Sequence, residues 1–271
     1  MLIRHDRRIS LVTQETAIRL PKPGPAKEMG RLSAMSLRPD VLSARRVLAV
    51  QPHPDDNEIG AGALIARLRD QGCDVRYVTV TDGSMGTTDP DMAPAKLAGL
   101  RRKEADAAAS LLGVSENRHL GHRDLLDSPM PGLRAELMQE IGEFRPDFVL
   151  TCDPWLPYEA HPDHLAVGMA VAAAVSFLQF PHVPGAPKDA PPQPAVAFYG
   201  TAQPNVRIPA GPFWQRKWEA VARHQTQFPP DALFQLRAFA ESMSQGEEGF
   251  FEPFKVLHPF FLHFNPAAVL A

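Results

Sequence analysis

The chain has 271 residues, enough for one large α/β domain or two small ones, and its composition (44% hydrophobic, 22% charged) is that of a globular protein. A formal net charge of −3 gives no general reason to expect nucleic acid as a partner. No apolar run approaches the roughly 20 residues that span a bilayer, and charges interrupt residues 1–19 where a signal peptide needs an apolar core. Cys73 and Cys152 lie far apart, outside any metal-binding spacing, and are expected in the core. We therefore expect a cytoplasmic protein that binds neither nucleic acid nor membranes.

The N-terminal 45 residues are predicted to form a basic arm. Residues 1–46 contain ten Lys and Arg residues but only four Asp and Glu residues. Prolines and a glycine within residues 21–25 argue against a long helix, and the charge argues against an independent core. The arm is either a surface extension or a segment that packs on a neighbouring subunit.

From residue 46 onward, short β-branched runs alternate with segments of helical periodicity. The expected strands are 47–51, 75–81, 118–120, 147–153, 195–200 and 206–208. The expected helices are 58–72, 94–112, 132–144, 164–180, 213–225 and 230–245, and a tail rich in Phe and His follows them. Alternating strands and helices predict a mostly parallel sheet covered on both faces. We therefore expect a Rossmann-like, three-layer α/β/α fold, with a single domain over residues 46–271.

Two motifs rich in His and Asp follow two of the expected strands. HPDD, at residues 53–56, begins two residues after the first strand. HPDH, at residues 161–164, follows the strand at 147–153 and opens a helix. Ligands of open α/β sheets bind at the carboxyl ends of the strands. If these two strands are neighbours, both turns meet at one edge of the sheet.

The residues of these turns suit a catalytic zinc site. Catalytic zinc typically takes three protein ligands of the His and carboxylate types and leaves one position for water. We expect His53, Asp56 and His164 to be these ligands. Asp55 is then available as the base that takes a proton from the water that Zn²⁺ activates.

The first His of HPDH is expected to complete the chemistry. His161 lies one helical turn before His164 and would face the same cavity. Hydrolysis of an acetamide forms a tetrahedral oxyanion and releases an amine, and a protonated His near the metal can stabilise the first and protonate the second. Asp163 either raises the basicity of His161 through a hydrogen bond or caps the following helix.

A resemblance to the LmbE-like, or PIG-L, family of zinc N-deacetylases is carried by four segments: QPHPDDNEIGAG, VTVTDGSMGT, RRKEADAAASLLG and DPWLPYEAHPDHLAVG. The last of these is most similar to the N,N′-diacetylchitobiose deacetylase branch. The resemblance implies a Rossmann-like fold, zinc on the three predicted ligands, Asp55 as general base, and His161 as acid or oxyanion stabiliser.

The same resemblance suggests residues that contact substrate. Arg102, in RRKE, matches a substrate-contacting position, and Asp124, in LGHRD, matches an acid that binds sugar hydroxyls. The alternatives are a surface Arg on a helix and a solvated loop Asp. Asp82 ends the second strand and would either bind substrate or orient a loop.

The residue after the LGHRD segment departs from the family pattern. The family usually has Gly after the acid of LGHRD, whereas this chain has Leu125, which puts the loop conformation around Asp124 in doubt.

Members of the chitobiose branch form hexamers in which a late His approaches the site of the next subunit. We expect a homo-oligomer, a trimer or hexamer, in which His258 or His263 takes this role, unless LHPFFLHF is simply a packed edge segment.

The expected function is zinc-dependent hydrolysis of the N-acetyl group of a small molecule that contains N-acetylglucosamine, such as diacetylchitobiose. One alternative is deacetylation of a pseudo-disaccharide, such as a thiol-cofactor or antibiotic precursor. Another is a metal-binding scaffold without catalysis. A dinucleotide cofactor is not expected, because EIGAG lacks the third spaced Gly of the binding fingerprint.

Overall fold

The computed structural model describes residues 39–263. These residues lie in the larger of the two units into which the chain divides, residues 37–271. Most of the predicted basic arm, residues 1–38, therefore lies outside the described part. The end of the predicted arm packs on the domain, because Val41, in the short 3-10 helix η1 (Val41–Ser43), is buried in the core.

A mostly parallel sheet forms the centre of the second unit, as the sequence predicts. Its strand order is β3-β2-β1-β4-β5-β8-β6, with β7 paired to β8. Pairing is parallel from β3 to β5, and β8 is antiparallel to β5 and β6. The strands are β1 (Arg46–Gln51), β2 (Asp74–Thr81), β3 (Glu116–His122), β4 (Phe148–Cys152), β5 (Ala195–Tyr199), β6 (Val206–Pro209), β7 (Gln245–Gly246) and β8 (Gly249–Leu257).

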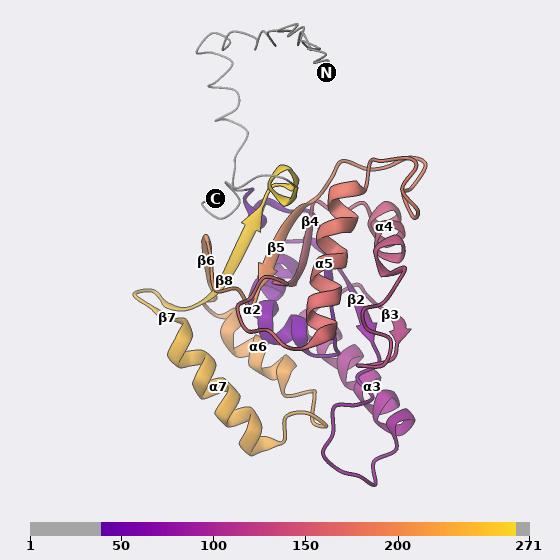
Figure 1. Ribbon diagram of the computed structural model, residues 1–271. Helices are drawn as coiled ribbons and strands as arrows, with labels where there is room; N and C mark the ends of the chain where they lie inside the picture. Colours follow the sequence, from indigo (N-terminus) through magenta and orange to yellow (C-terminus); the bar gives the residue numbers. More distant parts are fainter. Residues whose placement is uncertain (1–38, 264–271) are drawn as a thin grey trace, which may run out of the picture. The chain divides into compact units, whose positions relative to one another are not determined.

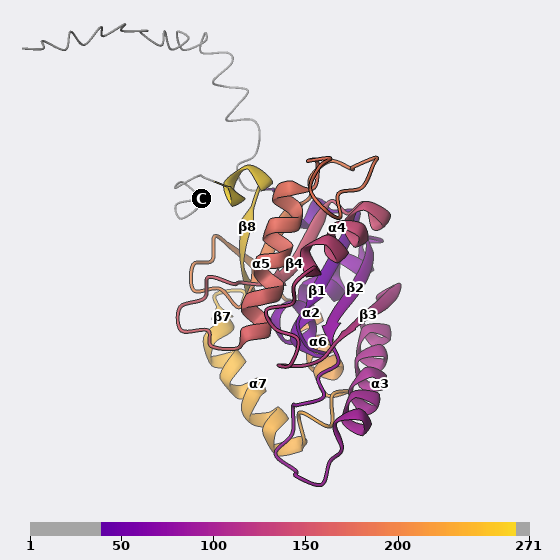
Figure 2. The ribbon, with the colours of Figure 1, turned by 45° about the vertical axis from the view of Figure 1, so that its right-hand side comes forward.

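Helices cover both faces of the sheet, which confirms the three-layer prediction (Figure 1, Figure 2). Helices α4 and α5 cover one face, and α2, α3 and α6 cover the other, while α7 packs on the outer side of α6. The helices are α2 (Asp56–Asp70), α3 (Pro94–Leu112), α4 (Leu133–Phe144), α5 (Pro162–Phe177), α6 (Phe213–Val221), α7 (Pro230–Ser244) and the 3-10 helix η2 (Pro259–Leu262). None of the helices within residues 39–263 combines the length and apolarity needed to cross a bilayer.

The central strands are buried on both sides, which explains their continuous apolar runs. In β1, Val47 and Ala49 pack under α2 and α3, whereas Leu48 and Val50 pack under α4 and α5. Side chains alternate between the faces of a strand, so a strand with helices on both faces needs apolar residues at every position.

Strand β8 is the main element that the sequence analysis missed, because a tail was expected there. Its residue Glu252 is 2% exposed. The Glu252 carboxylate accepts hydrogen bonds from Lys217 Nζ at 2.7 Å and from the backbone N–H groups of Ala63 and Leu64 at 3.0 and 2.7 Å. A carboxylate this deeply buried is tolerated only when it is fully hydrogen-bonded. The strand is therefore anchored to α2 and α6 by charge as well as by packing.

Replacing Glu252 with Ala should lower the free energy of unfolding by about 3–5 kcal/mol, because it leaves the Lys217 ammonium buried without its partner. Urea denaturation followed by circular dichroism would measure the change. Glu248→Ala, at an exposed position of the β7–β8 hairpin, is the matched control and should change the value by less than about 0.5 kcal/mol. Equal stabilities of the two variants would contradict the anchoring role.

Candidate active site

The HPDD turn joins the carboxyl end of β1 to the first residue of α2. The Asp56 carboxylate accepts a hydrogen bond from the backbone N–H of His53 at 2.8 Å, which closes the turn. Asp55 has a φ of 148°, which side chains rarely adopt and which only a well-packed surrounding structure maintains. The turn therefore holds three functional side chains in fixed positions at the sheet edge.

The HPDH turn lies at the beginning of α5. His161 is the N-cap of this helix, and its Nδ1 accepts a hydrogen bond from the backbone N–H of Asp163 at 3.3 Å. Glu159 fixes the preceding segment, because its carboxylate accepts from the His161 backbone N–H at 2.8 Å and lies 3.1 Å from Nδ1 of His164. Both imidazoles are thereby oriented before any ligand is present.

The two turns meet because β1 and β4 are neighbours in the sheet. The ring centroid of His53 lies 4.4 Å from that of His161 and 5.2 Å from that of His164. Each of the three rings places one nitrogen within 4.8 Å of the other two. Asp56 lies between the turns, with Oδ2 at 3.3 Å from His53 Nδ1 and Oδ1 at 3.6 Å from His164 Nε2. Residues more than 100 positions apart thus form one cluster.

Two further carboxylates approach the other side of His53. Its Nε2 lies 3.4 Å from both Asp124 Oδ1 and Asp163 Oδ2. Asp163 is completely buried and also accepts the backbone N–H of Leu125 at 2.9 Å. The cap of α5 is therefore His161 and not Asp163, and the Asp163 side chain contacts His53 where the sequence analysis offered a hydrogen bond to His161.

Negative charge dominates the cluster. Burial opposes a charge on His53, but hydrogen bonds with Asp124, Asp163 and Asp56 outweigh it and raise the pKa of His53 to about 12. Burial would raise the pKa of Asp56, yet its contacts with His53 and His164 lower this pKa to about 2. A cation is needed to balance the charge, and a bound divalent metal would do so more fully than a proton on His53.

The donor atoms of the cluster could hold a metal ion. Two imidazoles and one carboxylate, from His53, His164 and Asp56, are a common ligand set of catalytic zinc. The Asp56 and His164 side chains are 15% and 25% exposed, so this set is open to a substrate, whereas the Asp163 side chain is fully buried. Two groups of residues bring their ligand atoms within 4.8 Å of one another: His53, His161 and His164, and His53, Asp124, His161 and Asp163. Asp56 belongs to neither group, but its oxygens lie 3.3 Å from His53 Nδ1 and 3.6 Å from His164 Nε2.

Asp55 lies beside the cluster and contacts Arg101. The Arg101 guanidinium donates to Asp55 Oδ2 at 3.0 Å and to the backbone oxygens of Pro54 and Gly83 at 3.2 and 3.0 Å. Burial raises the pKa of Asp55 to about 6, and the charge of Arg101 limits that rise. The carboxylate is consequently a base of moderate strength that is ionised above about pH 6.

Arg101 is the site residue that the sequence analysis missed in favour of its neighbour Arg102. Helical periodicity contains the missing signal, because Arg101 lies four residues from both Leu97 and Ala105, which face the core. Arg102 is exposed and lines a separate surface pocket of about 230 Å³ together with Asp82. Arg101 lies on the face of α3 that packs on the core, and Arg102 lies on the face that is exposed.

The structure places Asp82 and Asp124 in one loop network. Asp82 Oδ1 accepts the backbone N–H groups of Ser84 and Asp124 at 3.0 and 3.2 Å, which matches the loop-orienting alternative. Asp124 is 3% exposed and accepts the N–H of Met85 at 3.1 Å, so it is not a solvated loop residue. The following Leu125 adopts a φ of 61°, the left-handed conformation that favours Gly, at a cost of roughly 1–2 kcal/mol.

The two late histidines flank η2. His258 caps η2 by accepting the N–H of Phe260 at 3.2 Å, and the ring of His263 lies 5.9 Å from that of Phe177 at the end of α5. Within residues 39–263 of one chain, no contact joins either of them to the His and Asp cluster. A role at the site of a neighbouring subunit stays a prediction.

Comparison with known proteins identifies the family. The profile of the PIG-L family, described as GlcNAc-PI de-N-acetylase, matches residues 48–175. The chain is 41% identical over 194 residues to the diacetylchitobiose deacetylase of Thermococcus kodakarensis, covering 69% of this chain and 72% of the relative. The chain belongs to the PIG-L family.

A solved structure and a further relative agree with this membership. The N,N′-diacetylchitobiose deacetylase from Pyrococcus horikoshii has a TM-score of 0.83 and 32% identity, and the match covers 93% of this chain and all of that one. A protein of Bacillus anthracis named "Probable N-acetyl-alpha-D-glucosaminyl L-malate deacetylase 2" is 31% identical, over 75% of this chain and 91% of the relative. The PIG-L protein described here is accordingly a deacetylase, a hydrolase that acts on amides.

Arg101→Met should reduce deacetylase activity about 100-fold, because it removes the group that holds the carboxylate of Asp55 in place. Lys103→Met, the matched control at an exposed position of the same helix, should retain activity within about threefold of the wild type. Acetate release from diacetylchitobiose would measure both. A larger loss in the second variant than in the first would contradict the role of Arg101.

Proposed function

We propose that the chain hydrolyses the N-acetyl group of an N-acetylglucosamine unit in a chito-oligosaccharide such as diacetylchitobiose, with zinc as cofactor. The observation that carries this proposal is the convergence of His53, Asp56 and His164 at one sheet edge, with Asp55 beside them and outside the ligand set. The relatives named for diacetylchitobiose support the choice of sugar.

His53, Asp56 and His164 would hold the metal. Zinc bound there would act as a Lewis acid on the acetamide carbonyl and would lower the pKa of water from 15.7 to about 7. The hydrogen bond between the Asp56 carboxylate and the His53 backbone holds these two proposed metal ligands in a fixed relative position. Glu159, at 3.1 Å from His164 Nδ1, orients the third ligand so that its Nε2 faces Asp56.

Asp55 is assigned as the general base. Arg101 holds its carboxylate by one charge-assisted hydrogen bond, so the second oxygen is available to the attacking water. With a pKa of about 6, the carboxylate is deprotonated at neutral pH and can accept a proton. The same proton is then available for the departing amine.

His161 is assigned as the hydrogen-bond donor to the oxyanion, and the leaving amine takes the proton that Asp55 removed from water. Its Nδ1 accepts the Asp163 N–H, so a neutral ring carries its proton on Nε2, the nitrogen that can face the substrate. Burial and the nearby His53 and His164 lower the pKa of His161, whereas the charge of Asp163 raises it. Asp163 therefore supports His161 through its charge and its backbone rather than through a side-chain hydrogen bond.

Arg102, Asp82 and Asp124 remain candidates for sugar binding. Asp124 lies closest to the proposed reaction centre, because its Oδ1 is 3.4 Å from Nε2 of His53. The cytoplasmic location and the assembly into a trimer or hexamer stay predictions.

A pseudo-disaccharide is the second candidate substrate. A relative in Kineococcus radiotolerans, 33% identical over 48% of this chain and 45% of the relative, favours it, because that protein is named as a deacetylase of an N-acetylglucosamine unit linked to myo-inositol. A metal-binding scaffold without catalysis is less well supported, because both the carboxylate of Asp55 and the ring of His161 are present and oriented.

Asp55→Asn should retain about one zinc per chain but lose at least about 1,000-fold in turnover, because the amide cannot accept the proton. His164→Ala should lose both zinc and activity. Metal analysis and acetate release on the same samples separate the two effects. Equal zinc content and equal turnover in the wild type and Asp55→Asn would refute the assignment of the base.

Acetate release should stop on chelation and return when zinc is added. A panel of diacetylchitobiose, N-acetylglucosamine and an inositol-linked N-acetylglucosamine would identify the preferred substrate, and we expect diacetylchitobiose to have the highest kcat/KM. Preference for the inositol-linked sugar would support the pseudo-disaccharide alternative. Zinc binding without acetate release from any member of the panel would support a scaffold.

A further inference from the structure

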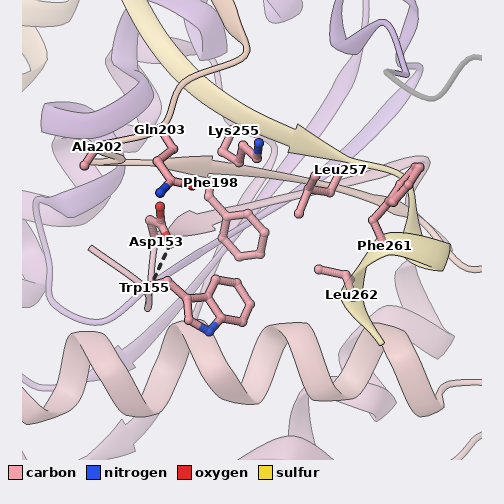
Figure 3. A pocket seen from close by; sticks show the side chains of 9 residues that line it. All are labelled: Asp153, Trp155, Phe198, Ala202, Gln203, Lys255, Leu257, Phe261 and Leu262. Atoms are coloured by element: carbon pink, nitrogen blue, oxygen red, sulfur yellow. Dashed lines mark hydrogen bonds between the residues drawn. The ribbon is translucent and has the colours of Figure 1, made fainter. Parts of the chain in front are cut away.

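A pocket of about 320 Å³ lies between α5 and β8, and one end of it is lined by residues that follow the carboxyl ends of β4 and β5 (Figure 3). Asp153 follows β4, Gln203 follows β5, and Lys255 lies on β8. Trp155 and Phe198 form an aromatic wall, with their ring centroids 5.5 Å apart in an edge-to-face arrangement. None of these residues belongs to the His and Asp cluster.

The pocket wall packs on α5, the helix that begins with the HPDH turn. Cys152 ends β4, and its Sγ lies 3.4 Å from the backbone oxygen of His164. Pro154 and the Cys152 carbonyl pack so closely on Gly168 of α5 that an added Cβ there would come within 2.8 Å of both. The pocket wall is therefore fixed to the helix that begins with the HPDH turn.

The lining of the pocket has two different sides. Figure 3 shows Asp153 and Gln203 with their polar ends turned toward each other at one end, and Leu257, Phe261 and Leu262 at the other. Asp153 is 9% exposed and Lys255 is 7% exposed, whereas the Trp155 side chain is 52% exposed. The Asp153 carboxylate accepts the Trp155 backbone N–H at 2.9 Å, which holds the indole at the pocket mouth.

We propose that this pocket binds the second pyranose ring of the substrate, the sugar next to the one that loses its acetyl group, with Trp155 as its stacking platform. This inference rests on the proposed function and adds a binding site for the second sugar. It predicts that the chain distinguishes a disaccharide from a monosaccharide.

The chemistry of a pyranose matches both sides of the pocket. A pyranose ring has an apolar face of C–H groups and an edge of hydroxyls, so it can stack on the indole and hydrogen-bond to Asp153, Gln203 and Lys255. The volume lies at the lower end of the range for small-molecule sites, about 300–1,000 Å³, which suits a single ring. A purely apolar group would offer no hydrogen bond to Asp153 or Gln203, and covering a polar group without one is costly.

A ratio of rates tests the proposal. We expect Trp155→Ala to lower the ratio of kcat/KM for diacetylchitobiose to kcat/KM for N-acetylglucosamine by about tenfold or more, and Gln203→Ala to lower it by about threefold. Gln203 is exposed, so its replacement should not impair folding. Phe234→Ala removes another exposed aromatic side chain, on α7 and outside the pocket, and should leave the ratio unchanged.

Tryptophan fluorescence gives a second test that does not depend on turnover. The chain has three Trp residues, and Trp214 and Trp218 are only 5% and 3% exposed, so acrylamide quenches mainly Trp155. In Asp55→Asn protein, saturating diacetylchitobiose should protect Trp155 from quenching, and N-acetylglucosamine should not. Trp155→Phe should remove the protectable signal.

Each result bears on one of the two proposals. Wild-type protein that releases acetate from neither sugar would overturn the proposed function. Normal acetate release with an unchanged ratio in Trp155→Ala and Gln203→Ala would overturn the pocket assignment alone. Equal protection of Trp155 by a phenyl glycoside of N-acetylglucosamine would show an apolar aglycone site and would also overturn it.

Discussion

Three carboxylates around one buried imidazole are the feature on which the site depends. Asp56, Asp124 and Asp163 all approach His53, and their combined charge raises the pKa of this ring to about 12. Buried carboxylates this close together require a positive partner. The cluster at this sheet edge is therefore suited to bind a cation. A substrate can reach that cation from the open side of the cluster.

The sheet order determines which residues can share this cluster. Because β1 and β4 are adjacent, the turns that follow them reach the same edge, and the sequence analysis could predict this meeting from two motifs placed after two strands. The central strands were equally predictable, since residues such as Leu48 and Val50 belong to continuous apolar runs that only a sheet covered on both faces requires.

Other features depend on contacts that local sequence does not reveal. Strand β8 contains Pro253 and two charged residues, and its stability comes from the bond between Glu252 and Lys217, which lie 35 positions apart. The distinction between Arg101 and Arg102 required the phase of α3 relative to the core. The positions of Asp124 and Asp163 around His53 depend on the loop that contains Leu125. Leu125 takes a left-handed conformation, which the sequence does not predict because this conformation favours Gly over Leu.

The position of the metal is the central question, because His53 belongs to both groups of clustered ligand atoms and also contacts Asp56. Crystals of the protein with one equivalent of zinc, measured on both sides of the zinc absorption edge, would locate the ion by its anomalous scattering. The account predicts one peak per chain, contacted by His53, Asp56 and His164, with Asp55 outside the coordination shell. A peak contacted instead by Asp124, His161 and Asp163, or no peak at either set, would contradict it.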